Sequence, residues 1–384
     1  MRDILSVLQA WWKAEEPLAL ATVVDVRKSA PRQPGTAMAI SLDGEVAGSV
    51  SGGCVEGAVY QLGRQVLGSS KPELAHYGYS DDEAFAVGLT CGGELDVFVE
   101  RIDHQARPWF GRLLDAIEEE SPVAIATVID APSEEDVPPR RGATMLIGPG
   151  WTEGSVETEG LQIAVVDDAR GMLQQGRTAE RRYGRHGERR LDDVRVFISS
   201  FAPRPRMFVF GAIDYAAAVA RVGSFLGYHV TVCDARATFA TSKRFPDADE
   251  VIVEWPHRYL ERVAIDERTA ICVLTHDPKF DVPLLEVALR SPASYIGAMG
   301  SRRTHDERLE RLRERGVDEA ELARLRSPIG LDLGARTPEE TAVSVAAELI
   351  QCRWGGSGRP LTDTSGRIHE VRGAAVDEAA GAGT

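Results

Sequence analysis

Cysteine is scarce in this sequence, with five residues among 384. The five are widely spaced and form no Cys-x-x-Cys pair, which excludes a disulfide framework and a zinc ribbon. We therefore expect reduced thiols, a cytoplasmic protein and no bound metal ion of its own. Cys233 and Cys272 stand in apolar runs that are typical of strands, and we predict that both are small core residues.

Positively charged residues are outnumbered by negatively charged ones, and long apolar runs are lacking. Lys and Arg number 44 against 59 Asp and Glu, which gives a net charge of −15. Such an acidic balance argues against a nucleic-acid partner. No apolar run reaches about 18 residues, so we expect no membrane span. The first residues alternate charged and apolar side chains at helical spacing, which predicts an amphipathic helix rather than a secretion signal.

The stretch from Met207 to Asp234 predicts the opening unit of a doubly wound parallel sheet. A first apolar run ends at Gly211, an Ala-rich segment of helical period follows, and a second apolar run ends at Asp234. Asp234 lies near the position where dinucleotide-binding folds place their ribose-binding acid. Of the three glycines in G-x-G-x-x-G only the first is present, because Ile213 and Ala216 occupy the other places. An isoleucine side chain there would project toward a pyrophosphate, which argues against ordinary NAD(P) binding.

An internal repeat with an offset of 105 residues occupies the first half of the chain. Pro17-Leu-Ala-Leu-Ala-Thr-Val-Val-Asp25 aligns with Pro122-Val-Ala-Ile-Ala-Thr-Val-Ile-Asp130. We predict an α/β protein whose N-terminal α+β domain consists of two related halves. The predicted boundaries are 1–105 and 106–200 for the halves, 201–206 for a Pro-rich linker, 207–354 for a Rossmann-like domain and 355–384 for a mobile tail.

Two cysteine motifs occur only in the first copy of the repeat. They are Ser51-Gly-Gly-Cys-Val-Glu56 and Cys91-Gly-Gly93. A glycine turn before a helix leaves backbone N–H groups to face an anion, and a thiol there has a lowered pKa. Cys54 would then be a nucleophile or soft-metal ligand, and Glu56 a proton acceptor; the plain alternative is a buried cysteine and a helix-start carboxylate. The candidates of this half are Arg32, a phosphate partner or simply an exposed loop arginine, with Ser51, Gly52, Gly53, Cys54, Glu56, Cys91, Gly92 and Gly93.

Polar residues of the second domain gather where its predicted strands end. Ligands of open α/β sheets bind at these carboxyl ends, so the clustering favours a binding crevice. The candidates are Gly211, Asp234, His276, Asp277, Gly300, Ser301 and Arg302. A structural alternative stands for two of them, since Asp277 could cap the turn before Pro278 and a lone His276 is more often structural. Ser301 and Arg302 start a predicted helix and would suit a phosphate.

The last predicted helix begins at Thr337-Pro-Glu-Glu340. Threonine as cap, proline in the first turn and glutamate three residues on form a capping box. The helix runs to about Cys352 and is apolar nearly all round, so we predict that it is buried.

Several motifs of the chain, taken together, carry a resemblance to a known family. The N-terminal motifs are Ala21-Thr-Val-Val24, Ser29-Ala-Pro-Arg-Gln-Pro-Gly35, Ser51-Gly-Gly-Cys-Val-Glu56 and Gly88-Leu-Thr-Cys-Gly-Gly93. The C-terminal motifs are Arg244-Phe-Pro246, Tyr295-Ile-Gly-Ala-Met-Gly-Ser-Arg-Arg303 and Pro328-Ile-Gly-Leu-Asp-Leu-Gly-Ala-Arg-Thr-Pro-Glu-Glu340. They resemble the XdhC/CoxI family of accessory proteins for molybdenum hydroxylases, and the resemblance spans about residues 15 to 352. Gly211-Ala-Ile-Asp214 departs from the Gly-Ala-Gly-His of many members and indicates a CoxI-like variant.

The resemblance implies a cofactor-insertion chaperone more than a catalyst. It implies that the protein binds molybdenum cofactor, assists its sulfuration with a cysteine desulfurase, and inserts it into the apoenzyme of xanthine dehydrogenase or carbon monoxide dehydrogenase. The family's cysteine motifs fall on Cys54 and Cys91, which become the expected cofactor contacts. Two alternatives stay open: an NAD(P)-dependent oxidoreductase with a redox thiol, and a scaffold without ligand binding. A homodimer is also left open.

Overall fold

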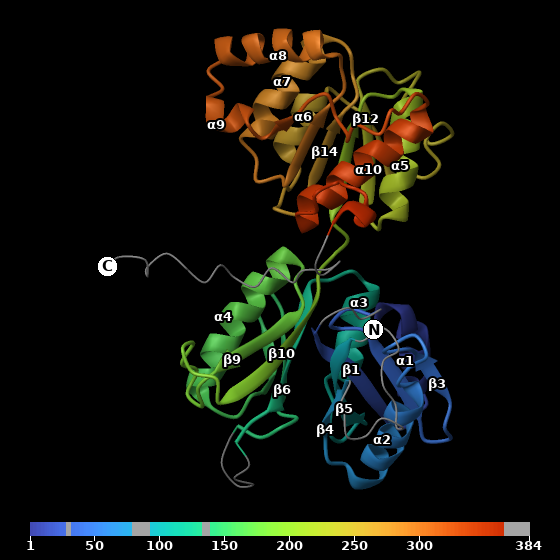
Figure 1. Cartoon of the computed structure of the whole chain (residues 1–384), viewed down its shortest axis with the longest axis vertical. Coiled ribbons are helices and arrows are strands. Elements are labelled where there is room, and N and C mark those ends of the chain that lie inside the picture. The colour runs from blue at the N-terminus through green and yellow to red at the C-terminus, as the bar shows by residue number, and fades with distance from the viewer. Residues whose placement is uncertain (28–31, 79–92, 133–138, 365–384) are drawn as a thin grey trace. The chain divides into compact units, whose positions relative to one another are not determined.

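The computed structural model describes residues 1–27, 32–78, 93–132 and 139–364. The chain forms two compact units, one built on Met1–Pro203 and the other on Arg204–Asp363 (Figure 1). Among the helices that lie in these described ranges, none is both long enough and apolar enough to cross a bilayer.

The first unit contains two antiparallel five-stranded sheets of the same topology. The first half contains η1 (Arg2–Ile4), α1 (Leu5–Lys13), β1 (Leu18–Arg27), β2 (Ala37–Ser41), β3 (Val46–Gly48), α2 (Glu56–Ser69), β4 (Glu73–Tyr77) and β5 (Glu94–Ile102). The second half contains α3 (Phe110–Glu118), β6 (Val123–Asp130), β7 (Thr144–Ile147), β8 (Thr152–Ser155), α4 (Glu159–Gln175), β9 (Ala179–Tyr183) and β10 (Val194–Phe201). The strand orders are β3-β2-β1-β5-β4 and β8-β7-β6-β10-β9. The predicted α+β repeat is confirmed.

The two halves have separate cores and one shared core. Apolar side chains of each sheet pack beneath its own helix, as with Val59 of α2 and Val165 of α4. A further cluster combines residues of both halves, among them Leu18 of β1 and Ile125 of β6. Burial of this shared apolar surface stabilises the two halves as one body.

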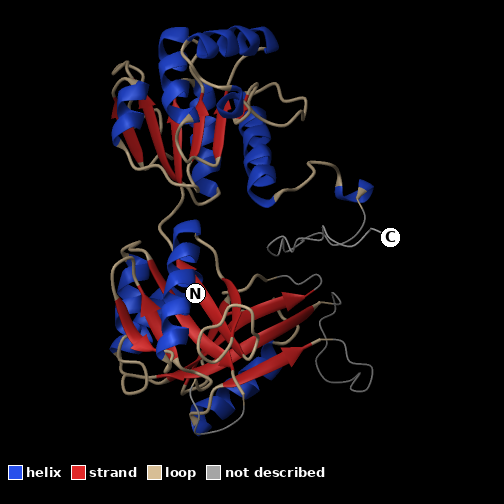
Figure 2. Ribbon diagram, turned by 90° about the vertical axis from the view of Figure 1, so that its left-hand side faces the viewer, coloured by secondary structure: helices blue, strands red, loops and turns tan. Residues whose placement is uncertain are grey.

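The second unit is a six-stranded parallel sheet with helices on both faces (Figure 2). Its elements are β11 (Arg206–Phe210), α5 (Asp214–Phe225), β12 (His229–Asp234), β13 (Glu250–Val253), α6 (Pro256–Arg262), β14 (Ala270–Val273), α7 (Pro278–Leu289), β15 (Tyr295–Ala298), α8 (Arg302–Glu314), α9 (Glu319–Leu322), β16 (Leu325–Arg326), α10 (Pro338–Trp354) and η2 (Leu361–Asp363). Central strands covered on both faces need continuous apolar sequence, which explains the runs ending at Phe210 and Val273. The Rossmann-like prediction is confirmed.

Strand order places the switch point of this sheet between β11 and β14. The order is β13-β12-β11-β14-β15-β16, so the chain winds outward in both directions from β11. In such sheets a crevice opens where the winding reverses, at the carboxyl ends of the strands. Cys233 and Cys272 are buried in β12 and β14, as predicted, and burial raises the pKa of each thiol to about 12.

Helix α10 begins as predicted but is not buried all round. Thr337 accepts a hydrogen bond from Glu340 N, and the Glu340 side chain accepts from Thr337 N, which completes the capping box. Val343, Ile350 and Trp354, however, are 56%, 46% and 68% exposed. The burial prediction is wrong for this side because composition does not indicate which helix faces have a neighbour. Helix α10 packs on α5 with its opposite side.

Candidate functional site

The loop between β3 and α2 carries the Ser-Gly-Gly-Cys motif and turns on two glycines. Gly52 and Gly53 have φ of +80° and +122°, values that side chains rarely allow. Both are exposed, and a Cβ added to either would meet no atom within 4 Å. Cys54 is partly buried two residues before α2, and its N–H donates to Ser51 Oγ at 3.0 Å.

The carboxylate of Glu56 holds this loop together. It accepts backbone N–H groups from Ser51 at 2.9 Å, Gly52 at 2.9 Å and Gly53 at 2.8 Å. The Ser49 and Ser51 hydroxyls also donate to it, at 2.7 and 2.5 Å. The N–H groups expected to face an external anion therefore bind an anion of the chain itself, because Glu56 follows the turn closely enough to reach back.

Glu56 is not poised to accept a proton near neutral pH. Burial opposes its ionisation, but hydrogen bonds from Ser51 and Ser49 outweigh burial and lower the pKa of Glu56 to about 2. A group with that pKa stays ionised and is a weak base. The geometry gives Glu56 the role of organising the loop.

The corresponding loop of the second half is shorter. Seven residues (49–55) separate β3 from α2, whereas three (156–158) separate β8 from α4. In the short loop Glu157 accepts from the N–H and the guanidinium of Arg140, at 2.7 and 2.9 Å. The repeat thus keeps the sheet and helix and changes the junction between them, as the confinement of the cysteine motifs to the first copy predicts.

The other candidates of the first half are not part of the loop between β3 and α2. Arg32 is exposed in the loop before β2, and Gly93 is buried just before β5. Cys91 and Gly92 lie outside the described residues. Within the ranges that the structure describes, no group of three His, Cys, Asp or Glu side chains could hold a metal ion.

In the second unit, the Gly211 turn and Asp234 are joined directly. Gly211 has φ of +108°, and a Cβ there would lie 3.0 Å from the backbone nitrogen of Thr275, so only glycine fits. Asp234 is buried and accepts from Ala212 N at 2.7 Å and from Arg236 through its backbone N–H, Nε and a terminal guanidinium nitrogen, at 2.7 to 2.9 Å. These four hydrogen bonds occupy the acceptor sites of the Asp234 carboxylate. A bound ribose would need the same sites for its hydroxyl groups. Ile213 occupies the N-cap position of α5 without a capping hydrogen bond, and its side chain packs against the core instead of projecting freely.

In the loop after β14, Asp277 makes the capping contact of its structural alternative. Asp277 is the N-cap of α7, where it accepts from Lys279 N at 3.1 Å and pairs with Lys279 Nζ at 2.9 Å. His276 is exposed beside it. Neither contact indicates a catalytic role.

A crevice of about 510 Å³ contains two of the predicted residues, Gly300 and Arg302. Gly300 follows β15 with φ of +154°, and Ser301 caps α8 by accepting from Thr304 N at 3.1 Å. Arg302 is exposed and has no ion-pair partner among the described side chains. The remaining lining residues are Tyr215, Met299, Pro328, Ile329, Gly330, Leu331, Asp332, Leu333, Gly334, Ala335, Thr341 and Ser344.

Most of this lining was not among the site residues predicted from sequence. The segment 328–335 forms one wall, and its glycines Gly330 and Gly334 have φ of +100° and +74°. The sequence does contain a signal for this wall, since Gly330 and Gly334 lie between the strand β16 and the capped helix α10. Glycines in such a segment often mark a close approach of the backbone. Gly211, Asp234, His276 and Asp277 are not part of this lining.

A buried ion pair supports two walls of the crevice. Arg308 of α8 donates to Asp281 of α7 at 3.0 Å, and both side chains are almost fully buried. The same guanidinium donates to Met299 O at 2.8 Å and to Ser327 Oγ at 3.0 Å. Met299 lines the crevice, and Ser327 directly precedes Pro328, which lines another wall. The ion pair of Arg308 and Asp281 therefore holds these two walls in position relative to each other.

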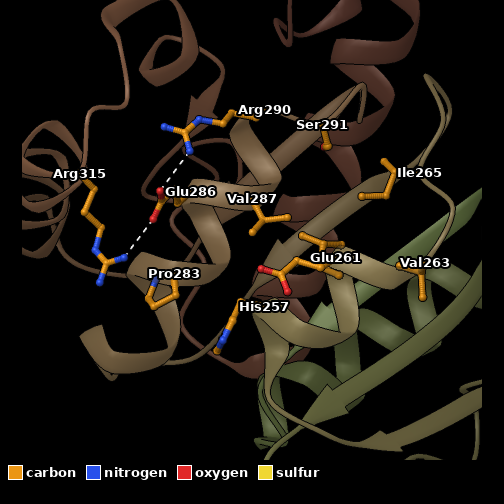
Figure 3. Close-up of a pocket in the computed structure, with 11 residues that line it drawn as sticks. His257, Glu261, Val263, Ile265, Pro283, Glu286, Val287, Arg290, Ser291 and Arg315 are labelled. Carbon is orange, nitrogen blue, oxygen red and sulfur yellow. Dashed lines mark hydrogen bonds and ion pairs between the residues drawn. The ribbon is translucent and has the colours of Figure 1, made fainter.

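A larger cavity of about 750 Å³ lies between α6 and α7 and contains none of the predicted residues (Figure 3). Its wall carries Leu260, Val263 and Val287, and Glu286 points toward Arg290 and Arg315, which donate to it at 3.1 and 3.0 Å. Because Glu286 already satisfies these two cations, the cavity presents no unpaired charge at that point. We assign no function to it.

Two family models match the chain. One, described as the XdhC Rossmann domain, matches residues 207–349. The other, described as the XdhC and CoxI family, matches residues 11–78 and again 116–184, once in each half of the repeat.

Similar proteins extend over most of the chain. A probable xanthine dehydrogenase subunit from Bacillus subtilis (strain 168) is 29% identical over 357 residues, which are 92% of this chain and 98% of that protein. The molybdenum cofactor insertion chaperone PaoD of Escherichia coli (strain K12) is 26% identical over 334 residues, or 87% of this chain and 83% of its own length. A crystal structure of a xanthine dehydrogenase from Bacillus halodurans superposes with a TM-score of 0.65 at 24% identity, covering 91% of this chain and 95% of that one. At this identity the likeness supports the fold alone.

Proposed function

This chain belongs to the XdhC and CoxI family, and on that premise we propose that it is an accessory protein for a molybdenum hydroxylase. It binds molybdenum cofactor as cargo, assists its sulfuration by a cysteine desulfurase, and inserts it into an apoenzyme of the xanthine dehydrogenase or carbon monoxide dehydrogenase type. The similarity to a relative named as a molybdenum cofactor insertion chaperone supports this proposal along 87% of the chain. We place this activity in the cytoplasm.

The observation that carries the proposal is the difference between the two matching junctions of the repeat. Both halves keep the same sheet and helix, yet only the first has a seven-residue junction (49–55) with glycines and a cysteine. The second half shows that the fold does not require this longer loop. A loop that the scaffold does not need is best explained by a ligand, since loops on a rigid scaffold commonly carry function.

The chemistry of the loop suits a soft metal centre. A cysteine sulfur is a favourable ligand for soft metals, and Cys54 is partly exposed next to the exposed Gly52 and Gly53. We propose Cys54 and Cys91 as cargo contacts, with Glu56 holding the loop in place. Within the second unit, taken by itself, we propose Arg302 at the start of α8 as a phosphate contact, because it is exposed and its guanidinium suits phosphate geometry.

Anaerobic titration of the purified protein with molybdenum cofactor tests this proposal. We expect saturable binding that Cys54→Ser and Cys91→Ser each weaken about tenfold, a loss of about 1.4 kcal/mol. Cys352→Ser is the matched control, because Cys352 is an exposed cysteine of α10 outside the proposed contacts. Parallel titrations with NADH and NADPH should show no binding.

Two results would overturn the carrier function. Absence of cofactor binding would leave the scaffold hypothesis. Tight nicotinamide binding without affinity for molybdenum cofactor would instead favour the oxidoreductase, although the four hydrogen bonds to Asp234 argue against it.

A further inference from the structure

The crevice of about 510 Å³ in the second unit has a wall that is already fixed in place. Ile329 N donates to Ala298 O of β15 at 3.0 Å, and Gly330 N donates to the buried Glu348 of α10 at 2.8 Å. Gly330 has φ of +100°, and a Cβ there would lie 2.5 Å from Ser344 Oγ. The strand and the helix therefore hold this wall in one position, and a ligand would meet a preformed surface.

Two side chains of opposite charge belong to the described lining of the crevice. Arg302 and Asp332 are both exposed, and neither has a hydrogen-bond or ion-pair partner among the described side chains. The neighbouring Arg303, which is not part of the lining, pairs with Glu307 at 3.0 Å. A ligand can therefore bind Arg302 and Asp332 without first breaking an ion pair.

Apolar side chains supply most of the remaining surface. Met299, Ile329, Leu331 and Leu333 line the crevice, and Tyr215 adds an aromatic ring. A volume of about 510 Å³ is within the range of about 300 to 1,000 Å³ that is usual for small-molecule sites. A planar heterocycle suits such a surface, because its faces are apolar while its edge keeps its hydrogen-bonding groups.

A carboxylate distinguishes heterocycles by their edges, since it only accepts hydrogen bonds when ionised. The 2-amino-4-oxopyrimidine ring of guanine and of pterin has a ring N–H beside an amino group. These two parallel donors match the two oxygens of Asp332. Adenine and cytosine instead place a ring-nitrogen acceptor beside the amino group, and this acceptor would face the carboxylate unfavourably.

We propose that this crevice binds a phosphorylated 2-amino-4-oxopyrimidine heterocycle, with Asp332 on its N–H edge and Arg302 on its phosphate. Two sources share this chemistry, a guanine nucleotide and the pterin phosphate of molybdenum cofactor. For the pterin, the inference rests on the proposed function and identifies the end of the cargo that the second unit binds. For a guanine nucleotide, it stands independently of that function.

Calorimetric titration of the full chain with GMP, IMP and AMP tests recognition of the edge. IMP lacks the 2-amino group, so we expect it to bind about tenfold more weakly than GMP, and we expect no measurable binding of AMP. Asp332→Asn should weaken GMP and strengthen xanthosine monophosphate, because the amide NH2 donates to the 2-oxo group while the amide oxygen accepts the ring N–H. Loss of folding cannot produce such a reversal. Equal binding of AMP and GMP would refute the assignment of Asp332.

Arg302→Ala tests the phosphate contact. It should weaken GMP at least about tenfold and leave guanosine, which has no phosphate, unchanged. Arg303→Ala is the matched control, since Arg303 is the next residue of α8 but is not part of the lining. Equal effects of the two variants on GMP would overturn the contact.

Titration of Asp332→Asn with molybdenum cofactor distinguishes the two sources. Weakened cofactor binding, in a chain that does not bind GMP, would assign the crevice to the pterin. Binding of GMP that the cofactor does not displace would assign it to a guanine nucleotide. If Asp332→Asn changes the affinity for neither ligand, the inference is refuted, whereas cofactor binding that still depends on Cys54 would leave the proposed function standing.

Discussion

Glu56 is the residue on which the shape of the cysteine loop depends. Three backbone N–H groups and two hydroxyls converge on its carboxylate, and the loop has the glycines needed to present them. The sequence predicted the glycine turn and the helix start. It did not predict that the anion in the turn is a side chain of the protein, since the same N–H groups would bind a phosphate equally well.

Replacement of Glu56 by glutamine should make the pH dependence of stability shallower in acid. The folded pKa of Glu56 is about 2 against an ordinary value of 4.5, so its contribution is full above pH 4.5 and is lost as the pH falls toward 2. We expect Glu56→Gln to lower the free energy of unfolding by about 1 to 2 kcal/mol at neutral pH, a value discounted for solvent screening. The difference from wild type should shrink steadily below pH 4.5. Urea unfolding at a series of pH values measures it.

Glu159→Gln is the control for this prediction. Glu159 is also the first residue of its helix, α4, but it is exposed and lies after the short junction of the second half. Glu159→Gln should lower the free energy of unfolding by well under about 1 kcal/mol, as surface substitutions usually do. Equal losses in the two variants would assign the effect to the helix dipole instead of the loop.

Helix α2 shows how an element combines tight packing with free surface. Gly63 faces the sheet, where a Cβ would lie 2.3 Å from Ile40 Cδ1 in a fully buried position. Gly68 is on the exposed side of the same helix, and a Cβ there would meet nothing within 4 Å. Close packing against the sheet therefore leaves no room for a side chain at Gly63, whereas Gly68 has free space around it.

Alanine at these two positions of α2 should have effects of opposite sign. Gly63→Ala should destabilise by about 1 to 3 kcal/mol, because the core must move to accept the methyl group. Gly68→Ala should stabilise by about 0.5 to 1 kcal/mol through its better helix propensity. Thermal unfolding of both variants under one set of conditions measures the pair. A stabilising Gly63→Ala would mean that Ile40 can adopt another rotamer without cost.

The helices and strands could be predicted from the sequence more fully than the neighbours that each of them meets in space. The strand-turn-helix-strand pattern from Met207 to Asp234 and the cap at Thr337 depend on local spacing, and the structure has them where the sequence placed them. The exposed side of α10 and the crevice wall at 328–335 depend on which elements become neighbours in space. A single sequence carries little of that information, since tertiary contacts decide it.

At the scale of the whole molecule, the apolar cores respect the division into two units. Each core cluster of the described residues draws its members from one unit only. The second unit also contains the buried pair of Asp281 and Arg308, which ties α7, α8 and the crevice walls together. Stability of one unit should therefore be separable from stability of the other.

Calorimetry of full-length variants should resolve this separation. Asp281→Asn leaves the buried Arg308 without its counter-charge, which should cost about 3 kcal/mol and lower one transition by roughly 6 to 12 °C. Glu56→Gln should lower only the other transition. A fragment of residues 204–363 should unfold cooperatively and show the same loss with Asp281→Asn. If both variants lower a single shared transition, or if the fragment fails to fold, the units depend on each other and the crevice would be stabilised by the first unit as well as by its own core.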